Sequence, residues 1–225
     1  MGGIQYLRKL WFSEGSPFAR KVRIVLAEKG LAYEKDVLNG IRPADTHQKI
    51  HPGLLVPVLV DGELTLFESN LIIDYLLRTY PANPPEMPQP PLVPALTRPE
   101  RHWEDAKMLA VLETMGNALA NFKLLRDEGA TPERFPYLAR HLTRIESCLD
   151  WLEDRATPEG FLPGWFSIMD VNLICLITYG EKRKLLKLQA RPRLEGIIAR
   201  FSNRPSIMST PVSEFGGRAI RPPDS

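Results

Sequence analysis

Proline placement limits how this chain can fold more than any other sequence feature. Of the 21 prolines, eight lie between Pro81 and Pro99. Proline lacks a backbone N–H and fixes φ, so this segment cannot be a helix interior or a central strand. We therefore expect a proline-rich linker at residues 82–98, between an N-terminal domain (residues 1–81) and a C-terminal domain (residues 99–225). A chain of 225 residues is long enough for both.

Before the linker, strand-like and helix-like patterns alternate. Lys9–Phe12 predicts a strand, the helical spacing of Phe18, Val22 and Leu26 predicts a helix ending at Gly30, and residues 32–37 predict a second strand. Such a unit implies a parallel, right-handed crossover.

A connector at residues 42–50 follows the second predicted strand. Asp61-Gly62 between two β-rich runs then predicts a two-residue hairpin. Apolar residues 71–76 predict a last helix, which Pro81 stops. With the connector counted as a helix, the order β-α-β-α-β-β-α is the thioredoxin-like arrangement.

After the linker, only helical patterns occur, which predicts an all-α bundle. Two long apolar seams have 4-3-4-3 spacing: Met108, Leu112, Met115, Leu119 and Phe122; and Leu138, Leu142, Ile145, Leu149 and Leu152. Residues 171–179 are apolar nearly all round, which predicts a buried central helix. Ser167 with Asp170 three residues later predicts a capping box at its start.

Composition excludes several classes of function. The net charge of +2 is too balanced to indicate nucleic acid or an anionic membrane as the main partner. No apolar run reaches membrane-spanning length, and we see no signal peptide. Cys148 and Cys175 have no metal-ligand spacing, so we expect buried thiols in a reducing cytoplasm. Four histidines form no ligand motif, so we expect no metal. The basic run at residues 182–193 is interpreted as a solvated helix face.

Three local features carry possible chemistry, the first being Ser16-Pro17. Proline at the first helical position makes Ser16 the N-cap, next to unpaired N–H groups and the positive helix end. An anion such as a thiolate is stabilised there. Serine is also a favoured N-cap without any catalysis.

The other two features flank the predicted hairpin. Val56-Pro57 precedes its first strand, and a cis bond there would expose the Val56 backbone for pairing with a short peptide; a trans proline opening a strand is the alternative. Glu68-Ser69 begins the following helix, where an α-amino acid group could be held. A capped helix start is the alternative there too.

Two segments resemble the glutathione-binding domain of glutathione transferases in the order and spacing of these three features: SPFARKVRIVLAEKG and VPVLVDGELTLFESNLIIDYL. The helical half, with its SIMD start and late FSNRPSIMSTP, is similar to that family's C-terminal domain. The resemblance implies a cytoplasmic, homodimeric detoxification enzyme that uses glutathione as co-substrate. Ser16 would then activate the glutathione sulfur, as in serine-type members, with Ser13 as a rival hydroxyl. Val56 would pair with the cysteinyl unit, Pro57 being cis, and Glu68 and Ser69 would hold the γ-glutamyl end.

One departure from the family pattern is Leu55, which occupies a position where many members have lysine. Arg42, Lys49 or His51 could replace that cation at the glycyl carboxylate. The second substrate would be a small hydrophobic electrophile in a pocket between the domains, lined by Trp11, Phe12, residues 108–115 and Phe215. Trp11 and Phe12 could equally be core. The alternatives are a glutathione-dependent isomerase or dehalogenase, and a non-catalytic partner-binding protein resembling stringent starvation protein.

Overall fold

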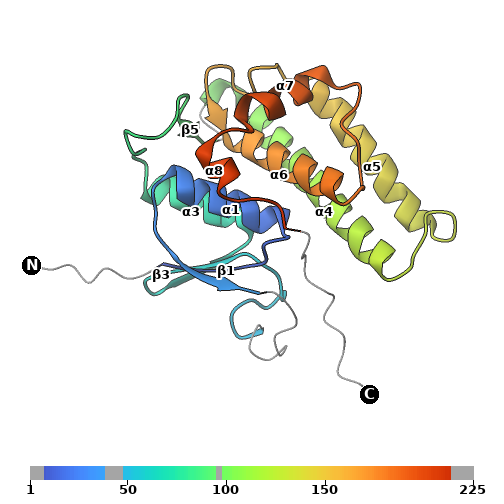
Figure 1. Ribbon diagram of the computed structural model, residues 1–225, viewed down its shortest axis with the longest axis horizontal. Helices are drawn as coiled ribbons and strands as arrows, with labels where there is room; N and C mark the ends of the chain where they lie inside the picture. The colour runs from blue at the N-terminus through green and yellow to red at the C-terminus, as the bar shows by residue number, and fades with distance from the viewer. Residues whose placement is uncertain (1–7, 39–47, 95–97, 214–225) are drawn as a thin grey trace, which may run out of the picture. The chain divides into compact units, whose positions relative to one another are not determined.

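The computed structural model describes residues 8–38, 48–94 and 98–213, which form two compact units (Figure 1). The first unit runs to Glu86 and includes residues 209–213; the second is Met87–Met208. The boundary between the units, after Glu86, falls within the proline-rich segment. Residues 209–213 join the first unit, where the Arg20 Nε–H donates to the buried Thr210 carbonyl at 2.6 Å.

The first unit is built on a four-stranded sheet of order β2-β1-β3-β4. Its strands are β1 (Lys9–Phe12), β2 (Glu34–Val37), β3 (Val58–Asp61) and β4 (Leu64–Phe67). β1 and β2 are parallel, whereas β3 is antiparallel to both of its neighbours. Helices α1 (Pro17–Glu28) and α3 (Ser69–Thr79) pack together on one face of the sheet (Figure 1). The thioredoxin-like arrangement is confirmed. The connector is described only at residues 48–50; Arg42 lies outside the described residues.

Helix α1 has strong signals at both ends. Ser16 is its N-cap and Pro17 its first residue, as the sequence predicts. At the other end, the N–H groups of Gly30 and Leu31 donate to the carbonyls of Ala27 and Leu26, which is a Schellman motif. Gly30 has φ +61°, which glycine adopts without a Cβ penalty.

The predicted hairpin forms one residue later than expected. Asp61 pairs with Leu64, so the two loop residues are Gly62 and Glu63, not Asp61 and Gly62. The Asp61 carboxylate faces inward and accepts hydrogen bonds from Arg8 Nε (3.1 Å), Tyr75 Oη (3.1 Å) and Tyr80 Oη (2.7 Å). Burial, followed by the charge of Asp61, raises the pKa of Tyr75 to about 12. These bonds keep Asp61 in the strand.

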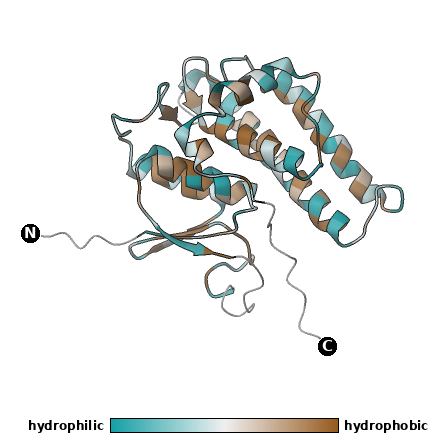
Figure 2. Ribbon diagram, in the orientation of Figure 1, coloured by the Kyte–Doolittle hydropathy of each residue, from teal (hydrophilic) through white to brown (hydrophobic). Residues whose placement is uncertain are grey.

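The second unit is helical, as predicted. Its longer helices are α4 (His102–Asp127), α5 (Pro136–Glu153), α6 (Ile168–Lys182) and α7 (Pro192–Phe201), with the short η1 (Pro99–Arg101) and α8 (Pro205–Met208). Helix α4 packs against α5 and α6. The α4 seam is buried throughout, and the α5 seam is buried except at Leu142, which is half-buried. Figure 2 shows hydrophobic residues along α6 and a mixture along α5.

A short strand interrupts the segment expected to be linker. β5 (Leu92–Val93) pairs in parallel with β6 (Phe166–Ser167). Leu92 and Val93 are the two consecutive non-proline residues between Pro91 and Pro94, so they keep the N–H groups that a ladder needs. Among the helices within the described ranges, none is long and apolar enough to cross a membrane.

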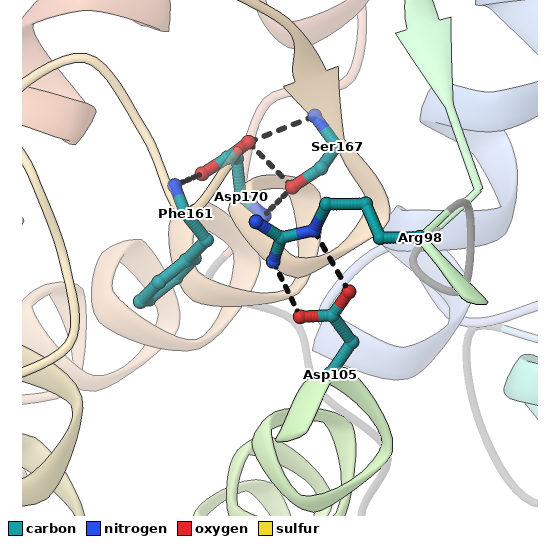
Figure 3. A network of polar contacts seen from close by, with 5 residues as sticks. All are labelled: Arg98, Asp105, Phe161, Ser167 and Asp170. Carbon is teal, nitrogen blue, oxygen red and sulfur yellow. Dashed lines mark hydrogen bonds and ion pairs between the residues drawn. The ribbon is translucent and has the colours of Figure 1, made fainter. Parts of the chain in front are cut away.

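The predicted capping box at the start of α6 is confirmed (Figure 3). The Ser167 hydroxyl accepts from the Asp170 N–H at 3.2 Å and donates to its carboxylate at 2.6 Å. The carboxylate also accepts the N–H groups of Ser167 and Phe161, at 2.8 and 3.0 Å. Burial raises the pKa of Asp170 to about 6, so it is still an ionised acceptor at neutral pH. Figure 3 also shows Arg98 bridging both oxygens of Asp105 at the start of α4.

Candidate functional site

Three segments that the sequence singles out meet at one edge of the four-stranded sheet. β1 and β4 both run antiparallel to β3, so they end at the edge where β3 begins. One row of paired residues crosses the three strands there: Trp11, Val58 and Phe67. Ser16 follows the end of β1, Val56 precedes the start of β3, and Ser69 follows the end of β4. Residues far apart in sequence are therefore brought together.

At the first position, Ser16 caps α1 with its side-chain oxygen. The half-buried Oγ accepts the Ala19 N–H at 3.2 Å, and its own hydrogen remains to be donated. Across the described part of the chain, neither the Ser16 hydroxyl hydrogen nor the Phe18 N–H has an acceptor. No acidic residue lies in the first turn, so the positive end of the helix is not neutralised there. This arrangement can stabilise an anion.

At the second position, the Val56–Pro57 peptide bond is cis, which agrees with what the resemblance implies. Val56 is half-buried, and its backbone N–H and C=O have no partner within residues 8–38, 48–94 and 98–213. One donor and one acceptor beside the start of a strand are what an extended peptide needs for pairing.

At the third position, the chain turns sharply into α3. Glu68 precedes the helix with φ +68°, a left-handed conformation that is costly for a residue with a Cβ, and its side chain is 62% exposed. Ser69 is the first helical residue and is only 3% exposed. The first turn of α3 also contains no acidic residue. A second positive helix end therefore lies at the same edge of the sheet.

Sequence reasoning named His51 only as a possible cation for the glycyl carboxylate, and the structure gives it different surroundings. The residue is 4% exposed, and its imidazole lies against the Phe67 ring, with 4.5 Å between centroids. Nδ1 accepts the Gly53 N–H at 2.8 Å, and Nε2 lies 3.9 Å from the Glu68 carboxylate. An HxG pattern before the strand is the local signal that could have indicated this turn.

The remaining residues considered from the sequence differ in exposure: Lys49 and Leu55 are exposed, whereas Ser13 is buried. Lys49 is exposed in the turn before His51, and Leu55 is 58% exposed. Ser13 is buried, and its carbonyl accepts the Ser16 N–H at 3.1 Å, so it supports the turn in which Ser16 lies.

Of the expected pocket residues, Phe12 belongs to the core of the first unit. It is buried, and the Arg23 guanidinium lies over its ring at 4.7 Å. Trp11 is half-buried. Met108 and Met115 are buried, whereas Phe215 lies outside the described residues.

Within the described ranges, no cluster of three or more histidine, cysteine or acidic side chains could hold a metal ion. The basic run at residues 182–193 belongs to the second unit. In the basic run, Lys182, Lys184 and Lys187 are exposed. Arg191 instead bridges α5, with Nη2 at 2.7 Å from both Glu146 and Asp150.

Comparisons with known proteins identify the family to which the chain belongs. Residues 10–85 match the family model of the glutathione S-transferase N-terminal domain. A probable maleylacetoacetate isomerase of Vibrio cholerae serotype O1 is 30% identical over 204 residues, which cover 85% of this chain and 89% of that protein. The chain therefore belongs to the glutathione transferase family.

Two other known proteins match different shares of this chain. A stringent starvation protein A homolog of Pasteurella multocida is 34% identical over 116 residues, 49% of this chain. The chain spans about half of that relative, 54% of its length. A solved glutathione S-transferase of Methylobacterium radiotolerans, in complex with glutathione sulfonate, has a TM-score of 0.74 at 24% identity, with coverage of 92% of this chain and 96% of that one. This last likeness supports the fold.

Proposed function

We propose that the first unit binds glutathione in an extended conformation along the sheet edge, with its sulfur at Ser16. The supporting observation is that, among the described residues, the Ser16 hydroxyl hydrogen, the Val56 backbone N–H and C=O, and the Ser69 N–H and hydroxyl have no hydrogen-bond partner. β1 and β4 are two strand spacings apart, about 10 Å. A tripeptide-sized ligand has a similar reach, since three extended residues span about 10 Å.

Each part of the ligand has a matching partner in this proposal. The γ-glutamyl carboxylate would accept from the Ser69 hydroxyl and N–H at the α3 N-terminus, and its ammonium would face Glu68. The cysteinyl backbone would pair with Val56 beside Pro57. We assign the glycyl carboxylate to Lys49.

The proposed reaction is transfer of the glutathione sulfur to carbon. The Ser16 hydroxyl donates a hydrogen bond to the sulfur, and the positive end of α1 favours its ionised form. The thiolate electron pair forms a C–S bond with a small hydrophobic electrophile. The displaced pair leaves with the leaving group or, on addition to a double bond, takes up a proton from water.

Calorimetric titration with glutathione tests the binding step. We expect millimolar or tighter binding, with a Kd raised roughly tenfold by Ser69→Ala, which removes one hydrogen bond to a charged group. Glu68→Gln should raise it too. Ser202→Ala, at an exposed serine of the second unit, is the control and should leave the Kd unchanged. No heat of binding in the wild-type protein would contradict the proposal.

A second candidate function is glutathione-dependent isomerisation, which the match over most of the Vibrio cholerae protein supports. The thiolate would add to a double bond, and after rotation the C–S bond would break again, so glutathione is regenerated. Counting thiols distinguishes the two: conjugation consumes one thiol per product, and isomerisation consumes none.

The third candidate is a non-catalytic partner-binding role, supported by the match to stringent starvation protein A homologs. It predicts no glutathione binding, so the same calorimetric titration separates it from both enzymatic functions.

A further inference from the structure

The buried imidazole of His51 contacts both segments that flank the hairpin at the sheet edge. His51 lies before β3, whereas Phe67 and Glu68 lie at the end of β4 and the start of α3. The ring packs on Phe67 at 4.5 Å, and Nε2 is 3.9 Å from the Glu68 Oε1. One side chain thus joins the β3 approach to the α3 N-terminus.

Hydrogen bonding determines which imidazole nitrogen carries the proton. Nδ1 accepts the Gly53 N–H at 2.8 Å, so it has no hydrogen of its own. The hydrogen of a neutral imidazole is then on Nε2, the nitrogen that faces Glu68. The N–H side of the ring therefore faces the carboxylate at 3.9 Å, an electrostatic contact that is longer than a hydrogen bond.

The turn from His51 to Val56 depends on the same residue. Besides the Nδ1 bond, the His51 carbonyl accepts the Leu54 N–H at 3.0 Å. A Cβ on Gly53 would lie 2.9 Å from the imidazole Cε1, so glycine is needed for the ring to occupy this place. Leu54 follows with φ +56°, and the chain then presents Val56, whose backbone N–H and C=O have no partner in the part of the chain that the structure describes.

We propose that His51 is a positioning residue of the glutathione site, an inference that rests on the proposed function. One imidazole fixes the turn that presents the Val56 backbone and directs the Glu68 carboxylate toward the ligand ammonium. It acts through Gly53 and Glu68 and does not touch the reacting sulfur.

Two substitutions at His51 separate the two contacts. His51→Asn keeps a side-chain acceptor for the Gly53 N–H, since asparagine bonds the backbone two residues ahead in an Asx turn, but it cannot reach Glu68. We expect the Kd for glutathione to rise roughly 2- to 5-fold, the range for one electrostatic contact to a largely exposed carboxylate. His51→Ala loses both contacts, and the Kd should rise roughly 10- to 100-fold.

A double-mutant cycle with Glu68→Gln tests how His51 acts. If it acts through Glu68, His51→Asn should change the Kd by less than about twofold in the Glu68→Gln background. A merely structural role would lower the affinity equally in both backgrounds. Thermal unfolding of each variant accompanies the titration, and His102→Asn, at an exposed imidazole, is the control.

The outcomes distinguish this inference from the function on which it rests. Absence of glutathione binding in the wild-type protein would overturn the proposed function itself. If the wild-type protein binds and Glu68→Gln weakens binding while His51→Asn does not, the role of His51 is wrong and the site stands. An equal effect of His51→Asn in both backgrounds overturns the link to Glu68.

Discussion

Replacement of Ser16 by glycine should raise the pKa of the bound glutathione thiol. Glycine removes the hydroxyl, yet as an N-cap it costs only a few tenths of a kcal/mol relative to serine, so α1 should still form, about as stable as before. A free thiol has a pKa of about 8.5 and is only a few per cent ionised near neutrality.

The expected size of the effect follows from the groups around Ser16. A hydrogen bond to a charged group contributes about 1.5–3 kcal/mol, and one pKa unit corresponds to about 1.36 kcal/mol. The hydroxyl therefore lowers the thiol pKa by roughly 1–2 units, and the α1 N-terminus, at about 0.3–1 kcal/mol, by less than one more. We expect a bound pKa near 6.5, which makes the thiol roughly three-quarters ionised at pH 7.

Thiolate absorbance, titrated against pH in the saturated complex, measures this directly. In Ser16→Gly the pKa should rise by roughly 1–2 units and stay slightly below the free value, because the helix end remains. Ser16→Thr, which keeps a hydroxyl, should restore most of the shift. An unchanged pKa in Ser16→Gly would refute the assignment of Ser16 and direct attention to Ser13.

Three other expectations concern stability and assembly. Because folding raises the pKa of Asp170 to about 6, its protonated form stabilises the fold; that contribution, on the order of 3 kcal/mol, is lost as pH rises from about 4 to about 6. Chemical unfolding should show the wild-type protein losing stability relative to Asp170→Asn across that window. Gly160→Ala should destabilise the protein by more than about 1 kcal/mol in the same assay, since φ is +131° and the new Cβ would lie 3.2 Å from the Asp170 carboxylate. If the protein is a homodimer, 52%-exposed Leu71 on α3 is a candidate contact, and Leu71→Glu should lower the mass measured by light scattering.

Local signals made much of the fold predictable from the sequence. Ser16-Pro17 and Gly30 mark the two ends of α1, and Ser167 with Asp170 marks the start of α6, because caps depend on residues a few positions apart.

Predictions were less accurate where distant residues decide the structure. The hairpin loop shifted by one residue because Asp61 bonds to Arg8 and to tyrosines on and after α3. β5 formed inside the proline-rich segment because a partner strand, β6, comes from residues 166–167.

In the candidate site too, local sequence signals were sufficient to predict some positions, whereas contacts between distant residues decided others. The positions of Ser16, Val56 and Ser69 at one edge follow from strand order, which the β-α-β and hairpin signals largely specify. The contacts of His51 with Phe67 and Glu68 could not be foreseen, because they join residues on opposite sides of the hairpin, whereas its bond to the Gly53 N–H is local.

A crystal structure of the protein with glutathione tests the central claim most directly. The account predicts the sulfur within hydrogen-bonding distance of the Ser16 Oγ, the cysteinyl backbone paired with Val56, and the γ-glutamyl carboxylate at Ser69. Glutathione bound elsewhere, or with its sulfur turned away from the α1 N-terminus, would contradict it.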